Sequence, residues 1–172
     1  FFTCKDITNF VGKALKQRKY FIALVKDFKI MELKNIPTGN SKEDIKTRER
    51  IISDFYYEWK RSNPTQRLFN IDLKDYINIR HISIIETVEH AARTYLSTLA
   101  VLQLDSILTL AKKVRIVNVK PKDKNQNQFE KMIKMEYELV GIGKVSLIVG
   151  IKRPNRDKIK EKVQYCITAI KA

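Results

Sequence analysis

The sequence predicts an α+β fold in which N-terminal helices are followed by a small, mostly antiparallel four-stranded sheet packed on a central helix. Three observations predict it. Apolar residues recur at three- and four-residue steps as far as residue 113, which is typical of amphipathic helices. Four runs with strand-like composition follow at regular intervals. The length of 172 residues is sufficient for one domain with a single sizeable core.

The helical part begins with residues 5–18, whose apolar positions share one face, and a strand over 20–25 follows unless that run is also helical. A turn at residues 37–40 precedes a helix that Ser41 begins with a capping-box pattern and that ends near Ser62. The basic side of this helix is either solvated or lies on a nucleic-acid backbone. Residues 68–84 are either extended or form a short helix.

The central helix is predicted from about Ser83 to Leu102. One apolar stripe of this helix should face the core. The neighbouring face carries an acid, an imidazole, a guanidinium and a hydroxyl at helical spacing. These four residues are Glu86, His90, Arg93 and Ser97. We take this row as the best candidate for a functional site.

A further helix begins at Asp105 and ends with Lys112 and Lys113. The predicted strands are residues 114–119, 131–140, 144–151 and 162–170, and Gly141-Ile142-Gly143 makes 131–151 a hairpin. Residues 1–63 form an N-terminal helical region, either separate or part of the same domain. Residues 64–172 form the α+β domain.

The net charge of +15 indicates an anionic partner. Residues 112–172 hold 16 Lys or Arg against 6 Asp or Glu, so this part alone contributes +10. Two loops between strands are strongly basic and could clamp a phosphate backbone. Their cations are Lys120, Lys122 and Lys124 in the first loop, and Lys152, Arg153, Arg156 and Lys158 in the second. Nucleic acid is the predicted partner, with RNA favoured over DNA.

These features together fit a metal-independent ribonuclease that uses no cofactor. Such an enzyme needs a base for the 2′-OH proton, an acid for the leaving 5′-oxygen and cations for the phosphorane. His90 could act as base or acid, Glu86 could fix its tautomer, and Arg93 could hold the phosphate. Polar residues of otherwise apolar strands are possible second partners. They are Lys144, Tyr165 and Thr168.

Each candidate also has a structural interpretation. Glu86 and His90 are spaced like an ordinary pair on a helix surface, which is worth a few tenths of a kcal/mol. Tyr165 fits a core aromatic, Thr168 an ordinary strand residue and Lys144 a solvated hairpin residue.

The order of the final segments carries a resemblance. The helix ETVEHAARTYLSTLAVL, then QNQFEKMIKMEYELVGIGKVSLIVGI, then KVQYCITAI resemble the nuclease-like domains related to barnase, EndoU, RelE and the nuclease colicins, which occur in mobile-element and phage polyvalent proteins. The resemblance covers roughly residues 80–170. It implies a toxin-like endoribonuclease whose helix carries His90 or Arg93 and whose sheet carries Lys144 and Thr168. A second histidine on the sheet is missing.

Two other functions remain open from the sequence: a non-catalytic nucleic-acid-binding or accessory module, and an interaction domain that docks an acidic protein such as an immunity protein. No phosphate-binding glycine loop, HExxH, EF-hand or nucleophile elbow is present in the sequence. The longest apolar run is too short for a membrane helix. Two cysteines, Cys4 and Cys166, form no disulfide framework or zinc-ligand pattern. A cytoplasmic location without membrane contact is expected, and the oligomeric state is left open.

Overall fold

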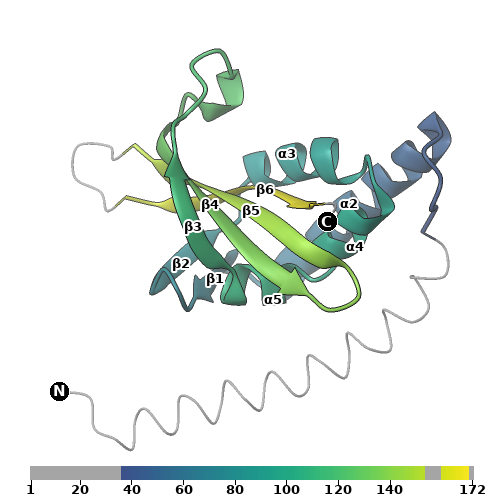
Figure 1. Cartoon of the computed structure of the whole chain (residues 1–172), viewed down its shortest axis with the longest axis horizontal. Coiled ribbons are helices and arrows are strands. Elements are labelled where there is room, and N and C mark those ends of the chain that lie inside the picture. Colours follow the sequence, from purple (N-terminus) through teal and green to yellow (C-terminus); the bar gives the residue numbers. More distant parts are fainter. Residues whose placement is uncertain (1–35, 154–159, 171–172) are drawn as a thin grey trace, which may run out of the picture. The chain divides into compact units, whose positions relative to one another are not determined.

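The computed structural model describes residues 36–153 and 160–170, and those from Pro37 on form one compact unit (Figure 1). The helix predicted at 5–18 and the strand predicted at 20–25 lie outside the described residues. The helices are α2 (Lys42–Ser62), α3 (His81–Ala91), α4 (Tyr95–Val101), α5 (Leu104–Leu110) and the 3-10 turn η2 (Lys124–Gln126). The strands are β1 (Arg67–Asn70), β2 (Asp75–Asn78), β3 (Lys112–Val117), β4 (Phe129–Leu139), β5 (Gly143–Lys152) and β6 (Lys162–Ala169).

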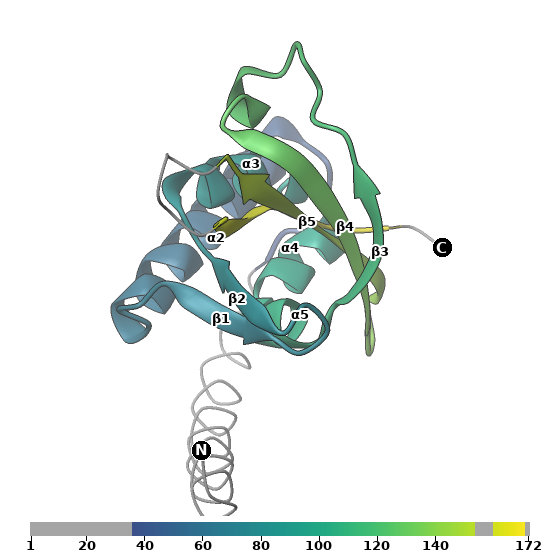
Figure 2. The ribbon, with the colours of Figure 1, turned by 90° about the vertical axis from the view of Figure 1, so that its left-hand side faces the viewer.

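The α+β class is confirmed, but the predicted four-stranded, mostly antiparallel sheet is wrong. The sheet has six strands in the order β1-β2-β6-β5-β4-β3, and it is mixed because β2 runs parallel to β6. The two strands that the sequence leaves undecided, β1 and β2, have four residues each. Runs this short are ambiguous between strand and helix. The sheet curls around α4 and α5 (Figure 2).

The predicted helix over Ser83–Leu102 is also wrong, because it is two helices. α3 ends at Ala91, and Thr94 begins α4 by accepting a hydrogen bond from Ser97 N at 3.2 Å. The hydrophobic periodicity continues across this break and conceals it. No single central helix therefore supports the sheet.

Of the other predicted boundaries, the start of α2 and the β4–β5 turn are confirmed, and both ends of α5 are wrong. Ser41 does begin α2 with a capping box, in which its Oγ accepts from Asp44 N and its own N–H donates to the Asp44 carboxylate. The β4–β5 hairpin is confirmed, with Gly141 at φ 80 and Gly143 at φ 95 in the turn. Asp105 is not the N-cap of α5, because the helix begins at Leu104 and its N-cap is Gln103. The Asp105 carboxylate accepts from Trp59 Nε1 at 2.6 Å. Lys112 and Lys113, predicted as a helix end, begin β3.

The main core lies between one face of β4–β6 and the helices α2, α4 and α5. Ile52, Tyr56, Leu104, Leu147 and Ile167 are among its fully buried members. A smaller cluster on the other side gathers Phe129, Met132, Val163, Tyr165 and Cys166. α2 packs against α3 and α4 in this unit. The predicted division of the chain at residue 63 stays a prediction.

Candidate functional site

Strand β6 has an open edge that α3 and α4 cover. β2 pairs with β6 only through Lys162 and Val163, so among the described residues no strand neighbours the rest of β6 on that side. Ser83 Oγ of α3 donates to Gln164 O, and Ser97 Oγ accepts from Ala169 N at 3.0 Å. Two helix hydroxyls thus satisfy backbone groups of an edge strand. Ser97 is committed to β6 and is not part of a row with His90.

A buried hydrogen-bond network fixes how α3 is rotated. Tyr56 OH of α2 donates to Gln164 Oε1 at 3.0 Å, and Gln164 Nε2 donates to Thr87 Oγ1 at 2.7 Å. All three side chains are fully buried, and burial raises the pKa of the Tyr56 hydroxyl far above its usual value. Because Thr87 points into this network, Glu86 one residue earlier is directed to a different side of α3.

Glu86 is buried at 3% exposure, and each of its carboxylate oxygens lies near a polar side chain. Its Oε1 accepts from Asn125 Nδ2 at 2.5 Å. Its Oε2 lies 3.6 Å from His90 Nε2, and the imidazole is half-exposed. A buried carboxylate next to an exposed imidazole can orient the ring. The structure therefore brings together two of the predicted residues and adds Asn125, which the sequence analysis did not single out.

Asn125 belongs to the loop between β3 and β4, which a second set of bonds folds inward. The Asp123 carboxylate accepts from Gln126 Nε2 at 2.6 Å and from Tyr165 OH at 3.0 Å. Its other oxygen accepts from Asn125 N at 3.0 Å. Burial, and then the Glu86 and Asp123 carboxylates, raise the pKa of Tyr165 far above its usual value, so its hydroxyl donates and does not act as a base. In the sequence, the polar run KDKNQNQ is the one feature that indicates a hydrogen-bonded loop here.

The remaining predicted catalytic residues lie elsewhere. The Arg93 side chain turns back to Glu89, with Nε donating to Glu89 O at 3.1 Å. Lys144 Nζ lies 3.5 Å from Glu136 on the sheet. Thr168 is in register with Ser146, which is in register with Glu136. Neither Lys144 nor Thr168 forms a hydrogen bond or ion pair with Glu86, His90 or Arg93.

A cation could find oxygen and nitrogen ligands on the same part of α3. Ligand atoms of Glu86, Glu89 and His90 all lie within 4.8 Å of one another. Two of these residues are exposed, and such groups occur on many helix surfaces. Metal-independent chemistry therefore stays a prediction.

The structure describes all three lysines of the first predicted phosphate-binding loop, but only part of the second loop. Lys120, Lys122 and Lys124 are exposed and form no ion pair with another described residue. Lys152 lies 3.8 Å from Glu161, so its charge is partly offset, and Arg153 is exposed. Arg156 and Lys158 lie outside the described residues.

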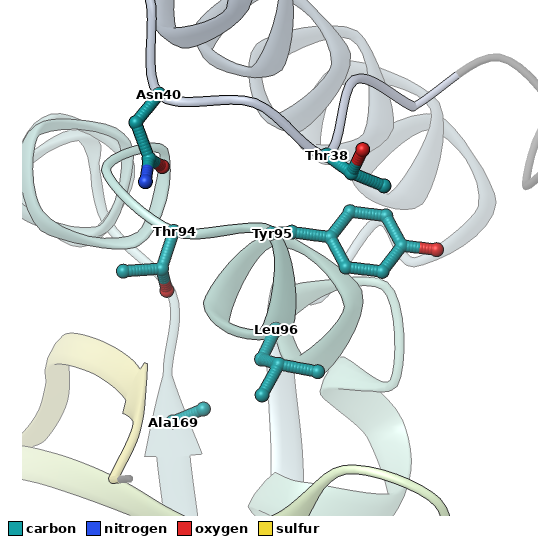
Figure 3. A pocket seen from close by; sticks show the side chains of 6 residues that line it. All are labelled: Thr38, Asn40, Thr94, Tyr95, Leu96 and Ala169. Atoms are coloured by element: carbon teal, nitrogen blue, oxygen red, sulfur yellow. The ribbon is translucent and has the colours of Figure 1, made fainter.

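A hollow of roughly 200 Å³ is lined by a different set of residues (Figure 3). It is lined by Thr38, Asn40, Thr94, Tyr95, Leu96 and Ala169. No predicted site residue lines it, and its lining carries no charge.

No protein-family model, curated protein or solved structure matches this chain. Among the described helices, none is both long enough and apolar enough to cross a bilayer.

Proposed function

We propose that this protein binds nucleic acid, RNA in particular, through a basic strip that follows β3 and the loop after it. The strip consists of Lys112, Lys113, Arg115, Lys120, Lys122 and Lys124, all exposed. β3 is an edge strand, so one side of it is open to a ligand. The net charge of +15 would draw a polyanion to this surface.

The observation that carries the proposal is the inward position of Asp123. It is the only acidic residue between 112 and 124. Its carboxylate accepts bonds from Asn125, Gln126 and Tyr165, so it is turned toward the protein. Within residues 112–124 the cations are therefore exposed, while the one acidic side chain of that segment bonds to groups of the protein.

The test is binding of a fluorescent single-stranded RNA, followed by anisotropy over a range of salt concentrations. Each lysine contact to a single strand contributes about 0.7 to the slope of log affinity against log salt. The triple substitution Lys120→Ala, Lys122→Ala, Lys124→Ala should weaken binding and reduce that slope by about 2.

The matched control removes three exposed cations from α2, at Lys42, Lys46 and Arg50. It changes the net charge equally and should leave the slope nearly as in the wild type. If this control weakens binding as much as the loop variant, the strip is not the contact surface. Equal loss would show instead that binding follows the total positive charge of the protein.

Cleavage of the bound RNA is a second candidate function, favoured by the Glu86–His90 pair. His90 Nε2 faces Glu86, which leaves Nδ1 open to take a proton from a 2′-OH. The 2′-oxygen would then attack phosphorus, and the bond to the 5′-oxygen would break as that oxygen takes a proton from water. The products would be a 2′,3′-cyclic phosphate and a 5′-hydroxyl. The Asn125–Glu86 bond holds the basic loop beside this pair. The resemblance to nuclease-like toxins is compatible with it.

The cleavage test is incubation of the protein with RNA in EDTA. His90→Ala should lower the rate by about 100-fold or more, the usual contribution of a general acid or base. His81→Ala is the matched control, because His81 is the other histidine and is exposed at the start of α3. A 2′-deoxy linkage should resist cleavage. Cleavage that persists in His90→Ala, or that EDTA abolishes, would contradict this mechanism.

A further inference from the structure

Two aromatic side chains lie exposed on the outer face of the β1–β2 hairpin. Phe69 and Tyr76 are cross-strand partners, 45% and 42% exposed, with ring centroids 5.4 Å apart and an interplanar angle of 74°. The guanidinium carbon of Arg67 lies 4.4 Å from the centre of the Tyr76 ring. The opposite face of the hairpin, with Leu68 and Ile77, packs on the main core. The hairpin is therefore already stabilised without its outer aromatics.

Recognition of unpaired bases uses this combination of groups. Bases of single-stranded nucleic acid stack on aromatic rings and on arginine planes, often on the face of a sheet. Such stacking tolerates many sequences because every base has a π-face. Lys74 is exposed in the turn of the hairpin and adds positive charge.

The acids next to this face are already engaged. The Asp75 carboxylate accepts a hydrogen bond from Lys162, and this bond lowers its pKa. Asp72 accepts from the backbone of Lys113 at 2.8 Å. The charge around the aromatic pair therefore favours an anionic ligand.

The same Asp72 bond joins the hairpin to the basic strip. Lys113 is one of the first residues of β3, and Ile71 N also donates to Thr109 O at 3.1 Å. β1 and β3 are opposite ends of the sheet order, yet the curl of the sheet brings the hairpin turn to the beginning of β3 (Figure 2).

We propose that Arg67, Phe69 and Tyr76 form a stacking platform for unpaired bases of a single-stranded RNA whose phosphates lie on the basic strip. This inference rests on the proposed nucleic-acid binding and specifies its ligand. The strip supplies affinity that depends on salt, and the platform selects strands with accessible bases.

The experiment compares two labelled RNA strands of equal length, an oligouridylate and a strand whose central bases are replaced by abasic ribose. Both carry the same phosphates. The full chain should bind the oligouridylate at least about 5-fold more tightly, the effect of stacking one base. The double variant Phe69→Leu, Tyr76→Leu should bind both strands with the weaker affinity and an unchanged salt slope.

Two further variants guard this comparison. Phe69→Tyr with Tyr76→Phe keeps both rings and should retain the preference for bases. Tyr57→Leu removes an aromatic that is 66% exposed on α2 and should change nothing. If circular dichroism shows that the leucine variant does not fold, the test rests on the wild type alone, through its relative affinity for the oligouridylate and the abasic strand.

Equal binding of both strands by the wild type would overturn the platform and leave the basic strip as the binding surface. A leucine variant that keeps the preference would also overturn it. Failure of the wild type to bind either strand would overturn the platform and the proposed function together.

Discussion

Arg48 is fully buried, and its hydrogen-bond partners among the described residues are all backbone carbonyls. Nε donates to Ala92 O at 2.7 Å, and Nη1 donates to Pro37 O at 2.8 Å and to Gly39 O at 2.6 Å. Arg48 thereby joins the segment before α2 to the break between α3 and α4. Burial takes the Arg48 guanidinium out of water, and the backbone carbonyls of the two segments replace its water partners. These bonds hold the segment before α2 and the α3–α4 break in place.

Arg48→Met should lower the free energy of unfolding by about 3 kcal/mol or more, because it leaves several buried carbonyls without a donor. Urea denaturation would measure the loss. The exposed Arg50 on the same helix is the control, and Arg50→Met should stay within about 0.5 kcal/mol of the wild type. Similar values for the two variants would mean that the carbonyls find other donors.

Cys166 is a second residue whose chemistry its surroundings determine. Burial, and then the Glu86 and Glu89 carboxylates, raise the pKa of its thiol to about 12. The thiolate is the reactive form, so the folded protein should react with iodoacetamide at pH 8 at least about 100-fold more slowly than the unfolded protein. The measurement uses a Cys4→Ser background, so that Cys166 is the only thiol that iodoacetamide can alkylate.

The same pKa gives the direction of a pH effect. Above about pH 9 the unfolded thiol loses its proton while the folded thiol keeps it, so the folded state loses stability as pH rises toward 12. The wild type should lose more unfolding free energy than Cys166→Ser over this window. A parallel decline in both proteins would contradict the raised pKa.

At the scale of elements, the β4–β5 hairpin contains a close contact that only glycine permits. A Cβ on Gly150 would lie 2.4 Å from Cδ1 of Phe129, whose ring covers it. Phe129 itself is fully buried and packs edge-on against Tyr165. The ring therefore has little room to move.

Gly150→Ala should lower the free energy of unfolding by about 1–3 kcal/mol through overpacking. Adding Phe129→Leu makes room, so the double variant should lose less than the sum of the two single variants. Thermal or urea unfolding of the three proteins tests this coupling. If the losses of unfolding free energy in the two single variants simply add up in the double variant, the Phe129 ring moves aside without strain.

The elements also show what a sequence pattern can predict. Ser41 marks the start of α2 and Gly141 marks the hairpin turn because capping and turn conformations depend on adjacent residues. The break before α4 was missed because the apolar spacing continues through it. The burial of Glu86 depends on Asn125, which is 39 positions away, so local periodicity contains no sign of it. The same holds for Lys112 and Lys113, which β4 draws into a strand.

At the scale of the whole molecule, the net charge of +15 works against the folded state while it favours a polyanion. Salt screens the repulsion among exposed cations. Raising NaCl from about 0.05 to 0.5 M should therefore raise the Tm of the free protein, by about 2–4 °C for each 1 kcal/mol gained. Affinity for RNA should fall over the same range.

Differential scanning fluorimetry and anisotropy on the same preparation would show both trends. A variant with several surface lysines changed to glutamate is the control, because its Tm should respond less to salt. A Tm that falls with added NaCl in the wild type would contradict the repulsion argument.

The open edge of β6 and the open edge of β3 differ in what keeps them from pairing with strands of other molecules. Helices α3 and α4 cover β6, whereas β3 is an outermost strand with Val114 51% exposed and Ile116 50% exposed. The like charges of Lys112, Lys113 and Arg115 oppose pairing of this strand with its counterpart in another molecule. Neutralising those lysines, by substitution or by saturation with a polyanion, should therefore promote self-association along β3. Solubility and ligand binding in this protein depend on the same few side chains.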